Sequence, residues 1–94
     1  MRLTSKEIEA IVQTFKEIFK EGEIYLFGSR VDDSKKGGDI DLFIISNNAT
    51  VAKKIDFLVL LKQRIGEQKI DVVISKDKNR AIEQEALKNG VKLC

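Results

Sequence analysis

The feature that most constrains this chain is a pair of aspartates, Asp39 and Asp41, at the start of an apolar run. Apolar residues stand at 24–27, before a polar loop, and again at 42–45, directly after the aspartates, so both flanks predict buried strands. Because side chains alternate along a strand, Asp39 and Asp41 share one face, about 7 Å apart. Burying unpaired carboxylates costs free energy, so this pair should lie at an accessible edge, contact a cation or bind metal.

Composition and length predict one domain spanning residues 1–94, with 43% hydrophobic residues to form a single core. The lone cysteine, Cys94, cannot form an internal disulfide, which argues against a secreted scaffold and makes the cytoplasm the expected location. No apolar segment approaches the ~20 residues that span a bilayer, so no membrane association is expected. The net charge of +2 arises from many charges of both signs, so a nucleic-acid partner is not expected either.

The order of apolar and punctuating residues predicts an α/β (α+β) fold, with a small mixed β-sheet packed against helices. Thr4 and Glu7 match a capping box, and apolar residues at helical spacing follow until Gly22, which suits a left-handed helix end. Helices are expected over residues 5–20, 50–65 and 79–88, with Gly66 and Gly90 as the later stops. Strands are expected over residues 24–27, 40–45, 69–74 and, at one edge, 91–93.

A third carboxylate, Asp71, interrupts another run with strong strand propensity. If its strand lies beside the 40–45 strand in suitable register, Asp71 joins Asp39 and Asp41 on one face. Two Mg²⁺ ions ~3.5–4 Å apart, bound to such carboxylates and to substrate phosphates, serve phosphoryl or nucleotidyl transfer. Gly28 would let the backbone approach a phosphate, and Ser29 offers a hydroxyl and an amide.

These residues together resemble the Gly-Ser … Asp-x-Asp … Asp signature of the DNA polymerase beta-like nucleotidyltransferases. The matching positions are Gly28-Ser29-Arg30, Asp39-Ile40-Asp41-Leu42 and Asp71, and the short length is similar to that of the minimal nucleotidyltransferase (MNT) branch. The resemblance runs from about residue 24 to residue 74 and implies the polymerase beta-like palm as the fold.

The resemblance also implies roles for individual residues. Gly28 and Ser29 would hold the nucleoside triphosphate, and Arg30 would support phosphate binding or the turn. Asp39 and Asp41 would bind both metal ions, and Asp71 would complete the metal site on the acceptor side. The implied reaction is Mg²⁺-dependent transfer of AMP from ATP to an acceptor hydroxyl.

Relatives of this size lack an acceptor domain, so the resemblance implies that the acceptor comes from a partner or a second copy of the chain. In the MNT branch that partner is a helical HEPN-type toxin, which the MNT protein neutralises as antitoxin by adenylylating (AMPylating) it. A non-catalytic module that neutralises its partner by contact alone is the main alternative. An enzyme acting on a small molecule is a weaker one, because the chain has no residues to spare for a second domain.

Each motif also has a structural interpretation. Asp39 and Asp41 could cap the start of a strand at the surface, and Asp71 could be an edge-strand charge that discourages aggregation. Arg30 could pair with nearby aspartates in the loop. Histidine-based acid–base catalysis is excluded because the chain has no histidine, and a single cysteine cannot build a thiolate zinc site.

Overall fold

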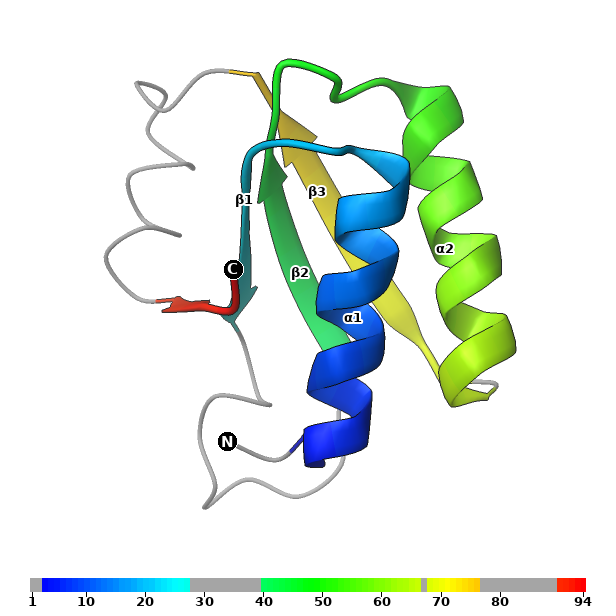
Figure 1. The fold of residues 1–94 in the computed structure, drawn as a ribbon. Helices are drawn as coiled ribbons and strands as arrows, with labels where there is room; N and C mark the ends of the chain where they lie inside the picture. Colours follow the sequence, from blue (N-terminus) through cyan, green and yellow to red (C-terminus); the bar gives the residue numbers. More distant parts are fainter. Residues whose placement is uncertain (1–2, 28–39, 67, 77–89) are drawn as a thin grey trace.

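The computed structural model describes residues 3–27, 40–66, 68–76 and 90–94, which form one mixed sheet with two helices on one of its faces (Figure 1). The elements follow in the order α1 (Ser5–Ile18), β1 (Glu23–Phe27), β2 (Ile40–Ile45), α2 (Val51–Ile65), β3 (Ile70–Ser75) and β4 (Val91–Lys92). The expected helix at 79–88 lies outside the described residues.

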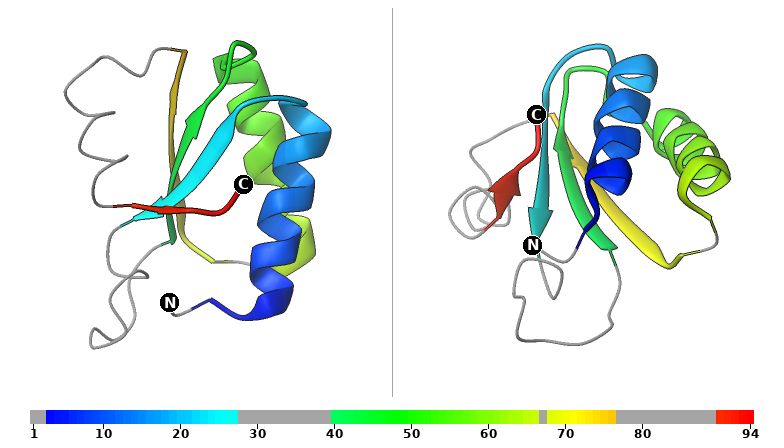
Figure 2. Two further views of the ribbon diagram at one scale, coloured as in Figure 1. Left: turned by 60° about the vertical axis from the view of Figure 1, so that its left-hand side comes forward. Right: turned by 60° about the horizontal axis from the view of Figure 1, so that its bottom comes forward.

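The sheet has the strand order β3-β2-β1-β4. Strand β1 pairs antiparallel with both β2 and β4, whereas β2 and β3 run parallel because α2 connects them. The mixed sheet and the short edge strand near the end of the chain confirm the sequence prediction. Two further views show that α1 and α2 both cover the same face of the sheet (Figure 2).

The main core lies between that face and the two helices. Alternate residues of β1, β2 and β3 point into it, and α1 and α2 contribute aromatic and aliphatic side chains that are almost fully buried. Phe19 packs against both Phe15 and Phe57, with ring centroids 5.7 and 6.0 Å apart, and so joins α1 to α2. The helical periodicity of both segments therefore reflects true core packing.

Local signals set the start of both helices. Thr4 and Glu7 form the expected capping box, in which the Glu7 amide donates to Thr4 Oγ1 and the Thr4 amide donates to Glu7 Oε1. Thr50 caps α2 by accepting from the Lys53 amide, so it is the cap rather than the first helical residue. Gly66 ends α2 with φ of 91°, as predicted.

The predicted end of α1 at Lys20 is wrong, because the helix ends at Ile18 and Lys20 itself takes a left-handed conformation with φ of 70°. Distant side chains bind the last carbonyls of α1: Asn48 Nδ2 donates to Phe19 O and Lys53 Nζ donates to Ile18 O. The side chains that bind these carbonyls lie about thirty positions further along the chain, so the local pattern could not reveal them.

Candidate active site

The face of the sheet opposite α1 and α2 carries the two described carboxylates of the predicted site. In β2, Leu42 and Ile44 point into the core beneath the helices, so Asp41 and Phe43 point to the opposite side. In β3, Val72 is in the same core, which places Asp71 and Val73 on the side opposite the helices. We call the side of the sheet opposite α1 and α2 the open face; its other members include Glu23, Tyr25 and Phe27 of β1, Ile45 of β2 and Lys92 of β4.

Asp41 and Asp71 are direct partners in the parallel register of β2 and β3. Neighbouring strands lie about 4.8 Å apart, so the two carboxylates start from adjacent backbone positions on one face. Asp41 is half-buried and Asp71 is exposed. The conditional prediction that Asp71 lies beside the β2 aspartates is therefore confirmed for Asp41.

Asp41 also faces β1, where its register partner is Phe27. Because β1 and β2 are antiparallel, the end of β1 meets the start of β2, and Phe27 is the residue directly before Gly28. The predicted residues Gly28, Ser29, Arg30 and Asp39 lie outside the described residues, so their roles stay predictions. Phe27 and Ile40, the described residues on either side of residues 28–39, both lie at the end of the sheet where Asp41 stands.

The donor set of the described pair suits a hard divalent cation, since carboxylate oxygens are the ligands that Mg²⁺ prefers. Two carboxylates in direct register repel each other, and a cation between them removes that cost. Within residues 3–27, 40–66, 68–76 and 90–94, no group of three potential ligands lies together. The sequence pattern assigns the third carboxylate to Asp39, which lies outside these ranges, so that assignment stays a prediction.

Sequence reasoning missed the polar side chains that β1 adds to the open face. The Tyr25 hydroxyl donates to Glu23 Oε2, and Lys92 of β4 is the register partner of Tyr25. Burial, together with the neighbouring Glu23 carboxylate, raises the pKa of Tyr25 to about 12. Tyr25 therefore keeps its proton at neutral pH and cannot serve as a general base there. The period of two along residues 23, 25 and 27 is the signal that could have found this row.

A further acidic residue, Glu21, lies at the end of the sheet opposite Asp41 and Asp71. It accepts hydrogen bonds of 2.6 Å from Ser46 Oγ and from the Asn47 amide, and the Ser46 bond is the main reason that the pKa of Glu21 is lowered. These bonds tie the turn before β1 to the end of β2. Glu21 is thus a structural acid, remote along β2 from Asp41.

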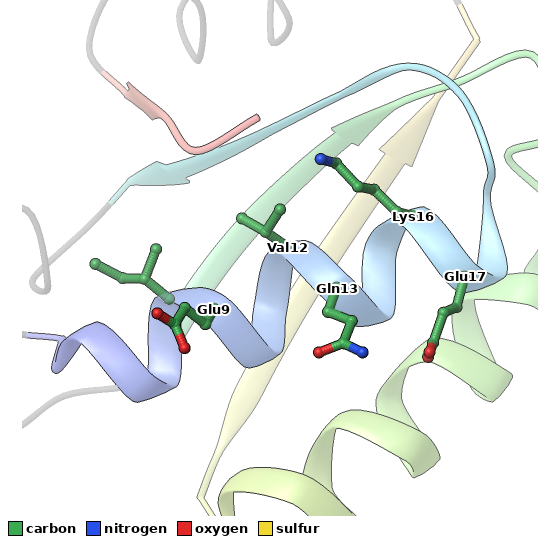
Figure 3. Close-up of a pocket in the computed structure, with 6 residues that line it drawn as sticks. Glu9, Val12, Gln13, Lys16 and Glu17 are labelled. Carbon is green, nitrogen blue, oxygen red and sulfur yellow. The ribbon is translucent and has the colours of Figure 1, made fainter.

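A shallow hollow runs along α1, and its described lining residues all belong to that helix: Ile8, Glu9, Val12, Gln13, Lys16 and Glu17 (Figure 3). In the close-up, Val12 and Lys16 project to one side of the helix, whereas Glu17 projects toward α2. Val12 borders this hollow and is only half-buried. The hollow contains neither Asp41 nor Asp71, so it is not the carboxylate site.

The fold and the carboxylate pair define a class: a small α+β domain with acidic side chains on the face of a mixed sheet that lies opposite its two described helices. The family profile described as Polymerase beta, Nucleotidyltransferase matches residues 6–94. The chain therefore belongs to the polymerase beta nucleotidyltransferase family and carries a nucleotidyltransferase domain, as the sequence motifs predicted. No curated protein matches the chain. Neither described helix has the length and apolar character required to cross a membrane.

Proposed function

We propose that this protein transfers AMP from ATP to a hydroxyl group on a partner protein, in a reaction that depends on Mg²⁺. The observation that carries the proposal is the direct register of Asp41 and Asp71 on the open face. Family membership supports nucleotidyl transfer as the reaction class. The nucleotide, the metal and the partner are the parts that the proposal adds.

In the proposed reaction the acceptor oxygen attacks the α-phosphorus of ATP. A new oxygen–phosphorus bond forms, the bond between the α-phosphorus and the bridging oxygen breaks, and pyrophosphate leaves. Asp41 and Asp39 would hold the cations, which supply charge neutralisation for the triphosphate when bound. Asp71, the more exposed of the described pair, would face the acceptor and accept or orient its hydroxyl proton. Gly28, Ser29 and Arg30 would hold the phosphates.

The proposed partner is a HEPN-type helical toxin, with this chain as its antitoxin. Support for a protein acceptor comes from the resemblance to the MNT branch, whose members of this size take their acceptor from a partner. Partner identity rests on the family resemblance and is the least direct part of the proposal.

Calorimetry of ATP binding tests the site. Binding should require Mg²⁺ or Mn²⁺ and should weaken at least tenfold in Asp41→Asn, because the cation loses a ligand that no other group replaces. Asp56→Asn is the matched control, since Asp56 is an exposed carboxylate on α2 and its loss should leave binding unchanged. Equal ATP affinity with and without metal would refute the site assignment.

Incubation with the toxin, ATP and Mg²⁺ tests the transfer, with mass spectrometry to detect an adenylyl group on the toxin. Asp71→Asn should retain more ATP binding than Asp41→Asn yet lose transfer, because only the transition state requires the acceptor-side carboxylate. Modification that disappears in Asp41→Asn while the complex survives would identify an enzyme.

A second candidate function is neutralisation of the partner by contact alone. The observation that favours it is a row of exposed apolar side chains on α2, which nucleotidyl transfer does not require. A tight complex without modification under any nucleotide would support this alternative.

A further inference from the structure

The open face becomes more exposed toward the end of the sheet that carries the carboxylates. At the end far from Asp41, the open-face side chains of β1, β2 and β3 are buried, with no more than 8% of their surface exposed: Tyr25, Phe43, Ile45 and Ser75. At the near end, Phe27 and Asp41 are half-buried and Asp71 is exposed. All three strands thus expose their open-face side chains at the same end, so a ligand can reach the sheet there.

Phe27, Asp41 and Asp71 form a row across these three neighbouring strands. Asp41 has Phe27 as its register partner in β1 and Asp71 as its partner in β3. Neighbouring strands lie about 4.8 Å apart, so the row places Phe27 on one side of Asp41 and Asp71 on the other. Phe27 also packs against the buried open-face side chains of β1 and β2, so its ring is held in place beside Asp41.

The chemistry of this row suits two different parts of the reactants. In the proposed reaction a cation at Asp41 holds the triphosphate, and Asp71 faces the acceptor. The position across Asp41 from Asp71 then lies on the side of the nucleotide, and the side chain there is aromatic. A phenyl ring has no group that binds a phosphate, whereas it packs favourably against the base and the ribose of a nucleoside.

We propose that Phe27 is a substrate-binding residue whose ring packs against the nucleoside part of the bound nucleoside triphosphate. This inference rests on the proposed function in placing the triphosphate at Asp41, and it adds the part of the substrate that the carboxylates do not recognise. Stacking on an aromatic ring tolerates different bases. The expected selectivity is therefore for a nucleoside triphosphate over inorganic tripolyphosphate, which has a similar charged chain but no nucleoside.

Calorimetry in the presence of Mg²⁺ tests this selectivity through two affinities, one for ATP and one for tripolyphosphate. Phe27→Leu removes the aromatic ring but keeps an apolar side chain, and it should weaken ATP binding about fivefold to tenfold. Its affinity for tripolyphosphate should stay unchanged, because the contacts to the phosphates remain. Phe43→Leu is the matched control: Phe43 is fully buried on the same face, so this variant should lower the melting temperature and leave the ratio of the two affinities unchanged.

A fluorescent reporter gives a second measurement that does not depend on the leucine variant. The chain contains no tryptophan, so Phe27→Trp introduces a single indole at the proposed contact. ATP with Mg²⁺ should quench or shift its emission, because the nucleoside packs against the ring, and tripolyphosphate should have little effect. Val73→Trp is the control reporter, since Val73 is 37% exposed on the open face of β3, on the acceptor side of the row. Its emission should change little with either ligand.

The two proposals fail in different ways. If ATP binding depends on metal and on Asp41, but Phe27→Leu leaves the ratio of affinities unchanged or ATP and tripolyphosphate affect Phe27→Trp equally, the role of Phe27 is wrong and the proposed function stands. If both Phe27 variants respond as expected but no adenylyl group is transferred, the nucleoside contact stands and the proposed reaction is wrong. Absence of ATP binding to the wild type would overturn both.

Discussion

The two faces of this sheet are formed by the same strands but have different roles. Toward the helices, the β2 side chains of Ile40, Leu42 and Ile44 are all fully buried. On the open face the same strand presents a half-buried Asp41 at its start, followed by Phe43 and Ile45, which are also buried. At the start of β2, one residue of displacement along the chain therefore separates a position that stabilises the fold from one that is available for chemistry.

The open face is not uniformly polar. Tyr25, Phe43 and Ile45 form a second, smaller cluster with Phe27 packed against it. The carboxylates stand beside this apolar cluster, at the end of the sheet where β2 and β3 begin. An apolar neighbour lowers the local dielectric response and strengthens the interaction of Asp41 with any cation.

The largest difference in stability between the two faces is expected at two neighbouring residues of β2, Asp41 and Leu42. Leu42→Ala should lower the free energy of unfolding by about 2–5 kcal/mol, because it leaves a cavity in the main core. Asp41→Asn should lower that free energy by less, because the substitution keeps the size of a half-buried side chain and leaves no cavity. Urea denaturation of the metal-free protein measures both.

For the rate of nucleotidyl transfer, Asp41→Asn should have the larger effect and Leu42→Ala the smaller one. Asp41→Asn should lower the rate of nucleotidyl transfer roughly a thousandfold, about 4 kcal/mol in activation free energy. Leu42→Ala should retain most of the activity at temperatures where it stays folded. A large stability loss in Asp41→Asn would instead assign this carboxylate a structural role.

A smaller effect is expected at the turn that leads into β1, which supports both faces. A methyl group at Gly22 would lie 2.2 Å from the Ile45 carbonyl oxygen, whereas one at Gly66 would meet no atom within 4 Å. Both glycines have positive φ, so both alanine variants carry backbone strain of roughly 1–3 kcal/mol. Gly22→Ala should cost about 2 kcal/mol more than Gly66→Ala. Equal melting temperatures would show that β1 and β2 can separate at this end without loss.

The helix ends and the turn at Gly22 show what the sequence could and could not predict. Thr4, Thr50 and Gly66 act through residues three or four positions away, so the capping pattern located those helix ends. The end of α1 depends on Asn48 and Lys53, and Gly22 is required by its approach to Ile45. Contacts between distant segments decide such positions, and the local pattern does not contain them.

The candidate site also has one part that the sequence predicted and one part that it did not. Alternation in β2 and β3 predicted which side chains share a face, but the register that pairs Asp41 with Asp71 is fixed by how α2 returns the chain to the sheet. The sequence could state the pairing only as a condition. The neighbours Glu23 and Tyr25 were missed because neither belongs to a motif, although the alternation along β1 puts them on one face. Lys92 joins them only through the pairing of β1 with β4.

Two adjacent valines of β3 allow the two faces of the sheet to be compared through the same substitution, valine to alanine. Val72 is 5% exposed on the helix side and Val73 is 37% exposed on the open face. Val72→Ala should cost about 2 kcal/mol and Val73→Ala less than about 0.5 kcal/mol, because only the first removes methyl groups from the core. Thermal denaturation of the pair measures the difference. Equal losses would mean that the open face of β3 is covered in solution.

A further expected effect, confined to high pH, is a pH dependence that originates on the open face. The folded protein raises the pKa of Tyr25 from its ordinary value of 10 to about 12, through burial and the Glu23 carboxylate. The unfolded chain therefore releases this proton first as the pH rises. The stability contributed by neutral Tyr25 should be complete below about pH 10 and should decline between about pH 10 and pH 12.

Tyr25→Phe removes the titrating group, so its melting temperature relative to the wild type should rise across that interval. Tyr25 is the single tyrosine of the chain, and its ionisation can therefore be followed directly through phenolate absorbance, with an expected midpoint near 12. A midpoint near 10 would show that the hydroxyl is solvated and that the apolar cluster beside the carboxylates is open to water. Asp41 would then lie in a more polar environment, and its interaction with a cation would be weaker than the packing of Tyr25, Phe27 and Phe43 indicates.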